Sequence, residues 1–97
     1  MAIVIESFYD DQQELTYRGH FDLAAFFGRI PESDELRSLG WRFVHTLRSE
    51  LPDAQPWVSY RVFEGKLTAT SRRQKDVEAT LARLEVLASL EQAGITI

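Results

Sequence analysis

Alternating apolar and polar residues at the start of the chain predict two β-strands, over residues 3–9 and 15–21. The polar stretch between them is typical of a turn, and the adjacent carboxylates of Asp10 and Asp11 project in different directions, which disfavours a metal site. A three-residue loop, Asp11 to Gln13, would pair Tyr9 with Leu15 and place the apolar side chains of both strands on one face. We expect that face to close over the helices.

Helical spacing replaces alternation in the next part of the chain. Asp22 is the expected N-cap of a short helix that ends at Gly28. Ser33 and Asp34 are expected to begin a longer helix that continues to about Leu51. Its core stripe is predicted to contain Leu36, Gly40, Phe43, Leu47 and Leu51.

A second hairpin is predicted between residues 57 and 70. The pair Glu64-Gly65 separates strands over 57–63 and 66–70, and the glycine supplies a positive φ angle. This register pairs Val62 with Leu67 and directs both side chains toward the helices. The preceding stretch, 51–56, contains two prolines and is predicted to be a loop.

The longest helical pattern runs from Ser71 to Gly94. Ser71 and Gln74 have the spacing of a capping box, and Gly94 suits the left-handed conformation at a helix end. One apolar stripe, expected in the core, contains Val77, Leu81, Leu84, Leu87 and Ala88. A second apolar row on the opposite side contains Ala79, Ala82, Val86, Leu90 and Ala93. Two interpretations remain open: this row is a face for partner binding or self-association, or its alanines are good helix formers on an exposed face and only Val86 and Leu90 need an explanation.

The order β-β-α-β-β-α predicts an α+β fold, a two-layer sandwich with a mostly antiparallel four-stranded sheet and helices on one face. Residues 95–97 are a candidate for a short fifth strand. A chain of 97 residues is expected to form a single domain over 1–97. The pattern leaves the order of the strands open.

The amino-acid composition excludes some kinds of site and disfavours some kinds of partner. The chain has no cysteine, which excludes disulfides, thiolate metal sites and a thiol nucleophile. Its net charge of −4 opposes non-specific nucleic-acid binding unless positive charge gathers on one face. We expect a cytoplasmic protein without a membrane partner, because the sequence contains no signal-peptide pattern and no apolar run of membrane-spanning length. Its arginine and alanine usage fits GC-rich coding DNA and favours a bacterial or phage source.

Two sets of residues are candidates for partner binding. On the sheet face turned away from the helices, we expect Trp57, Phe63, Arg61, Phe8 and Arg18. On the helix faces, we expect Val86, Leu90, Trp41, His45 and Arg48. For Trp41 there is an alternative, in which the indole packs sideways against a neighbouring loop or helix.

The leading hypothesis is a small non-catalytic protein–protein interaction domain of the adaptor or inhibitor type, with a protein partner or a homodimer. No cofactor and no metal are expected. An aromatic and arginine-bearing sheet face also resembles the platforms of single-strand RNA binders, but nucleic acid is the less favoured partner because a basic surround is missing. A second alternative is a small enzyme or ligand-binding domain that uses His20, although the chain contains no nucleophile elbow, phosphate loop or HExxH motif.

Overall fold

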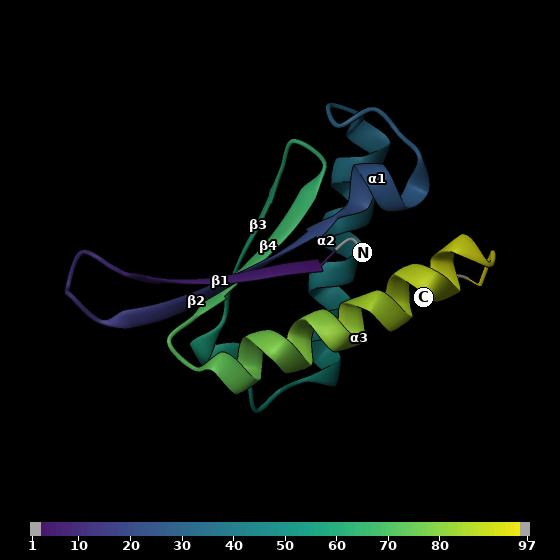
Figure 1. Ribbon diagram of the computed structural model, residues 1–97. Coiled ribbons are helices and arrows are strands. Elements are labelled where there is room, and N and C mark those ends of the chain that lie inside the picture. The colour runs from purple at the N-terminus through teal and green to yellow at the C-terminus, as the bar shows by residue number, and fades with distance from the viewer. Residues whose placement is uncertain (1–2, 96–97) are drawn as a thin grey trace.

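The computed structural model describes residues 3–95 and shows a sheet with helices on one side (Figure 1). The strands are β1 (Ile3–Tyr9), β2 (Leu15–Asp22), β3 (Ser59–Phe63) and β4 (Lys66–Ser71). The helices are α1 (Leu23–Phe27), α2 (Asp34–Glu50) and α3 (Gln74–Gln92), with a short 3₁₀ helix, η1 (Gln55–Trp57), before β3. The predicted α+β fold and the order β-β-α-β-β-α are confirmed.

The four strands form one antiparallel sheet in the order β1-β2-β4-β3. Tyr9 pairs with Leu15 across the first hairpin, and Val62 pairs with Leu67 across the second, as the alternation predicts. Glu64 and Gly65 both have positive φ angles, which is the geometry of the tight turn expected between β3 and β4. The pairing of β2 with β4, which joins the two hairpins, could not be predicted from the sequence.

Both long helices lie on the same face of the sheet, which we call the inner face. Helix α3 packs on β2 and β4, and α2 packs on β3 and against α3. Two glycines allow this close approach. A Cβ atom on Gly40 would lie 2.7 Å from a methyl of Val62, and one on Gly19 would overlap Leu81.

The core lies between the helices and the inner face. Residues of the predicted stripes are almost fully buried there: Leu36, Phe43, Leu47, Leu67, Val77, Leu81, Leu84, Leu87 and Ala88. The predicted N-caps are confirmed as well, because the Asp22 carboxylate accepts from Ala25 N at 3.0 Å and the Ser33 hydroxyl accepts from Leu36 N at 3.3 Å.

The predicted capping box of the last helix is wrong. Ser71 is the last residue of β4 and pairs with Tyr17, and its buried hydroxyl accepts from Arg73 N at 3.0 Å. The strand therefore continues to Ser71, and Arg73 occupies the N-cap position without a side-chain hydrogen bond to the helix backbone, although its guanidinium lies 3.0 Å from the Asp76 carboxylate.

The other end of α3 behaves as predicted. Gly94 has a φ angle of 84° and its N–H donates to Glu91 O, while Ile95 N donates to Leu90 O at 3.0 Å. Ile95 thus belongs to the helix cap and to no strand, and residues 96–97 of the candidate fifth strand lie outside the described residues.

Two further predictions need correction. Trp57 belongs to η1 and does not begin β3, because Pro56 is accommodated in the first turn of a 3₁₀ helix and cannot donate to a ladder.

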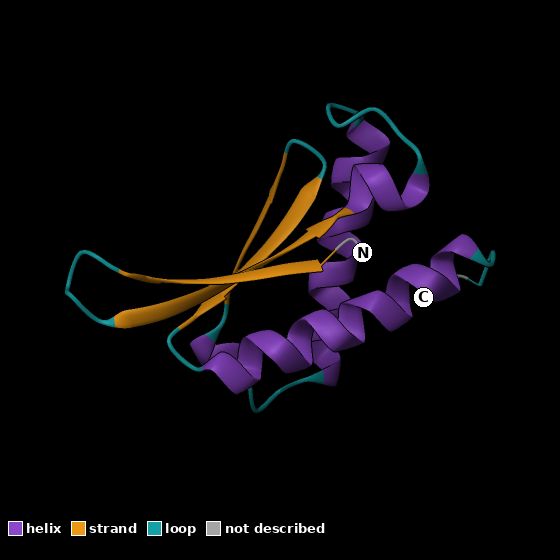
Figure 2. Cartoon of the chain, in the orientation of Figure 1, coloured by secondary structure: helices purple, strands orange, loops and turns teal. Residues whose placement is uncertain are grey.

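The expectation that the whole inner side of the first hairpin closes over the helices is also wrong. Figure 2 shows this hairpin extending beyond the helical layer. Tyr9 and Leu15 are consequently exposed, and Ile5 is exposed because α3 packs on β2 and β4 and not on β1.

Candidate protein-binding surfaces

The sheet face turned away from the helices, here called the outer face, carries aromatic rings that are each held next to an arginine. The guanidinium of Arg18 lies 4.5 Å from the ring centroid of Phe8, and that of Arg61 lies 4.6 Å from the centroid of Phe63. Phe63 is nevertheless 54% exposed. Cation–π contact of this kind orders both side chains before any partner arrives.

A polar network joins β1, β2 and β4 on the same face. Glu6 accepts from Arg18 at 2.7 Å, and the two ring nitrogens of His20 lie 3.3 Å from Glu6 and 2.9 Å from the Thr68 hydroxyl. The hydrogen bond from Arg18, followed by the contact with His20, lowers the pKa of the Glu6 carboxyl below its usual value. His20 is thus engaged within the sheet.

The outer face carries charges of both signs. Arg18, Arg61 and Lys66 project there among threonines, against the carboxylates of Glu6 and Asp22. Glu64, in the turn beside Lys66, adds a third carboxylate next to this face, so its charges are close to balance although the net charge of the chain is −4.

Trp57 borders the outer face where β3 begins. Its ring is 55% exposed and lies 5.2 Å from the Arg73 guanidinium. A shallow cleft of about 460 Å³ separates Trp57 from Asp10, with hydroxyl groups of Thr16, Ser59 and Thr70 among its lining.

Asp10, on the far side of that cleft, is held by the hairpin turn. Its carboxylate accepts from the backbone N–H groups of Gln12 and Glu14 and from Arg72 at 2.8 Å. These bonds, that from Glu14 foremost, lower the pKa of Asp10 from its usual 3.8 to about 2. Asp10 is therefore a structural anion of the turn, committed to partners within the chain.

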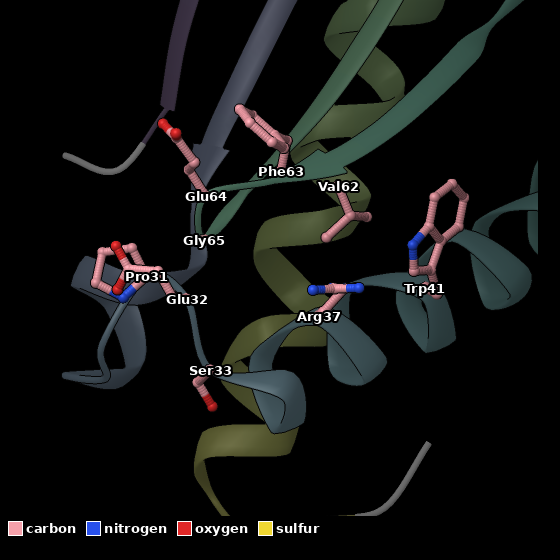
Figure 3. A pocket seen from close by; sticks show the side chains of 9 residues that line it. All are labelled: Pro31, Glu32, Ser33, Arg37, Trp41, Val62, Phe63, Glu64 and Gly65. Carbon is pink, nitrogen blue, oxygen red and sulfur yellow. The ribbon is translucent and has the colours of Figure 1, made fainter.

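A second cleft, of about 540 Å³, lies between the start of α2 and the turn joining β3 to β4. Figure 3 shows Val62 at its centre with Phe63 on one side and Trp41 on the other, and Arg37 beside them. Trp41 remains 43% exposed, so it serves as one wall of an open cleft. The fold thereby brings together two residues, Trp41 and Phe63, that the sequence assigned to separate faces.

The remaining helix-face residues are distributed over the surface. His45 is exposed, and the guanidinium of Arg48 lies 5.6 Å from the Tyr60 ring centroid. On α3, Val86 is exposed as expected, whereas Leu90 is half-buried and its carbonyl accepts from Ile95 N. Of the second apolar row, only Val86 thus presents a large, strongly exposed apolar group.

One exposed group was missed by the sequence reasoning. Ile5, Tyr9 and Leu15 lie on the inner side of the first hairpin and are 40%, 69% and 42% exposed. Their alternation is that of a buried strand face, so no signal in the sequence distinguishes them from core residues. Only the placement of α3 over β2 and β4 leaves them bare.

Within residues 3–95, no helix is long and apolar enough to cross a membrane, and no cluster of three or more potential metal ligands occurs. Comparison of the chain with protein-family models, with curated proteins and with solved structures gave no match.

Proposed function

We propose that this protein is a non-catalytic protein-interaction domain that binds another polypeptide through the outer face of its sheet. The observation that carries the proposal is the set of exposed aromatic rings, Trp57 and Phe63 foremost, each with an arginine against it. Tryptophan, tyrosine and arginine dominate the residues that contribute most to binding at protein interfaces. Rings held in place by arginines also lose little conformational entropy on binding.

The cleft between Trp41 and Phe63 supports the same function. It lies at the β3 edge of the outer face and has an apolar floor at Val62. An open cleft of this kind accommodates one large apolar side chain of a partner. Its border carries charges of both signs, from Arg37, which lies 3.7 Å from Asp34, and from Glu32 and Glu64. The contact surface would thus continue from the outer face around the β3 edge onto α2.

A second candidate function is single-strand RNA binding by the outer face. The observation that favours it is the presence of Arg18, Arg61 and Lys66 beside exposed rings. Glu6, which already pairs with Arg18, weakens this attraction for phosphate. We therefore rank protein binding first.

Site-specific photo-crosslinking in the source organism tests the proposal. A photoreactive amino acid replaces Trp57 in one variant and Phe63 in another, and the control replaces Ser49, which is exposed on α2 away from the outer face. We expect the same protein adduct from positions 57 and 63 and its absence from position 49. Adducts to RNA alone, or identical adducts from all three positions, would contradict protein binding by this face.

A solution assay distinguishes RNA binding from protein binding. Binding of a fluorescent single-stranded RNA would have to weaken steeply as salt concentration rises and be lost in Arg61→Ala. We expect the wild-type chain and the variant to show equally weak binding.

A further inference from the structure

The outer edge of β1 is open along its length. β1 is the first strand of the sheet order and, within the described residues, pairs only with β2. Asp10 N donates to Glu14 O, so these residues form a hydrogen-bonded pair, and such pairs recur at every second position of an antiparallel ladder. The backbone groups of Ile5, Ser7 and Tyr9 therefore point away from β2 toward the open edge.

The side chains beside this edge are apolar on the inner side. Ile5 and Tyr9 are 40% and 69% exposed, because α3 covers β2 and β4 and stops short of β1. Figures 1 and 2 show the tip of the first hairpin reaching past the start of α3. Tyr9 and Leu15, which flank that hairpin's loop, are both exposed.

Proteins normally protect such an edge by proline, lysine, a bulge or an inward-pointing charge. The β1 sequence Ile-Val-Ile-Glu-Ser-Phe-Tyr contains no proline and no lysine, and its register with β2 runs without a bulge from Ile3 to Tyr9. Its one charged residue, Glu6, lies on the outer side and is engaged by Arg18. The edge is thus built to pair with another strand.

We propose that a second copy of this chain pairs with β1, antiparallel and about a two-fold axis at Ser7, so that two sheets join into one of eight strands. This inference rests on the proposed function in that another polypeptide is the ligand, but it uses a different surface. Because both copies contribute the same edge, the contact is isologous: where residue i of one copy lies opposite residue j of the other, residue j of the first copy also lies opposite residue i of the second.

Charge selects the register. An axis at Glu6 would place the two Glu6 carboxylates directly opposite each other, and an axis at Phe8 would oppose Glu6 and Asp10, both of which are repulsive. An axis at Ser7 avoids both pairs and also uses the full strand, because it sets residues 4 to 10 of one copy against residues 10 to 4 of the other.

In this register the side chains of residues 5, 6, 8 and 9 complement one another across the joined sheet, while Val4 lies opposite the partner's Asp10. On the inner side, Ile5 of each copy lies opposite the partner's Tyr9, so that the exposed apolar groups cover each other. On the outer side, Glu6 lies opposite the partner's Phe8, whose ring already holds the partner's Arg18. Each Arg18 guanidinium then lies between the Glu6 carboxylates of the two copies, so that positive and negative charges alternate and cancel.

Sedimentation of the full chain over a concentration series, combined with crosslinking, tests the proposal. Ile5→Lys places an inward-pointing charge at the edge, and Val86→Lys is the matched control, because Val86 is similarly exposed at 45% but lies on α3. We expect a wild-type dimer, a dissociation constant at least about tenfold higher in Ile5→Lys, and no change in Val86→Lys. Thermal unfolding of each variant confirms that it is folded.

Crosslinking reports the register itself. Because the chain has no cysteine, Ser7→Cys introduces a single thiol next to its own symmetry mate, at about 5.5 Å between Cα atoms, within disulfide range. The control is Ser38→Cys, exposed on α2. We expect mild oxidation to give a covalent dimer rapidly from position 7 and slowly from position 38.

The outcomes separate the two proposals. A dimer that survives Ile5→Lys, or equal crosslinking at positions 7 and 38, overturns pairing through β1. A monomer at every concentration also overturns it, while binding through the outer face is still decided by adducts at positions 57 and 63. Loss of those adducts with an intact β1 dimer overturns the outer-face function alone.

Discussion

Replacing Gly19 with alanine should loosen the contact between α3 and β2. The new Cβ would overlap a methyl of Leu81 and lie 3.1 Å from a methyl of Val77, and both residues are buried. Overpacking of this kind costs about 1–3 kcal/mol, of which the lower flexibility of alanine in the unfolded chain offsets up to about 1 kcal/mol. A net loss of about 1–2 kcal/mol corresponds to a fall in Tm of roughly 4–16 °C for a domain of this size.

A double-mutant cycle assigns this loss to the helix contact. Leu81→Ala alone should cost about 2–5 kcal/mol, because it leaves a cavity in the core. In the double variant the methyl group added at position 19 occupies part of the vacated space, so the combined loss in urea unfolding should be smaller than the sum by about 0.5–3 kcal/mol. Leu87→Ala is the control, since Leu87 is equally buried but is not among the atoms nearest to Gly19.

Additive effects of Gly19→Ala and Leu81→Ala would refute this reasoning, as would a Gly19→Ala variant more stable than the wild type. Either result would mean that α3 does not rest on β2 at Gly19. The position of α3 would then no longer explain why β1 is exposed.

Three further predictions concern single side chains. Asp10→Asn should flatten the fall of Tm between about pH 4 and pH 2. The pKa of Asp10 is lowered to about 2 in the folded state, so its ionised carboxylate stabilises the fold fully above its usual pKa, and this stabilisation is lost as the pH falls through that range. A Tm profile identical to that of the wild type would contradict this. Ser33→Ala should lower the free energy of unfolding by about 1 kcal/mol in urea titrations, because Leu36 N loses its cap, whereas Ser38→Ala on the exposed side of α2 should change it little. Trp57→Ala and Phe63→Ala should each change stability by no more than about 0.5 kcal/mol, since both rings are more than half exposed, and a large loss of Tm in either variant would show a structural role instead of a binding role.

The elements of the fold could be predicted because their signals are local. The alternation around Tyr9 and Leu15, the Glu64-Gly65 turn and the caps at Asp22 and Ser33 all involve residues within a few positions of one another. The prediction failed at Ser71 and Trp57, where local signals compete. At Ser71 the capping-box spacing coincides with a strand end that is buried against β2, and tertiary burial prevailed.

The candidate surfaces could be predicted only in part. The register of each hairpin was sufficient to place Phe8, Arg18, Arg61 and Phe63 on the outer face, because side chains alternate along a strand. The cleft that joins Trp41 to Phe63 was not predictable, since it depends on how closely α2 approaches β3 at Gly40.

By itself, the sequence determined which segments are strands and helices and which side of each is apolar, because backbone propensities and periodicity act between near neighbours. Only the tertiary structure decided that β2 pairs with β4 and that the helices cover β2, β4 and β3 while β1 stays bare. That choice depends on the summed packing of distant surfaces, in which Leu81 over Gly19 and Val62 against Gly40 set where each helix rests. An apolar strand face such as that of Ile5 and Tyr9 has the same alternating sequence pattern whether a helix or another molecule covers it.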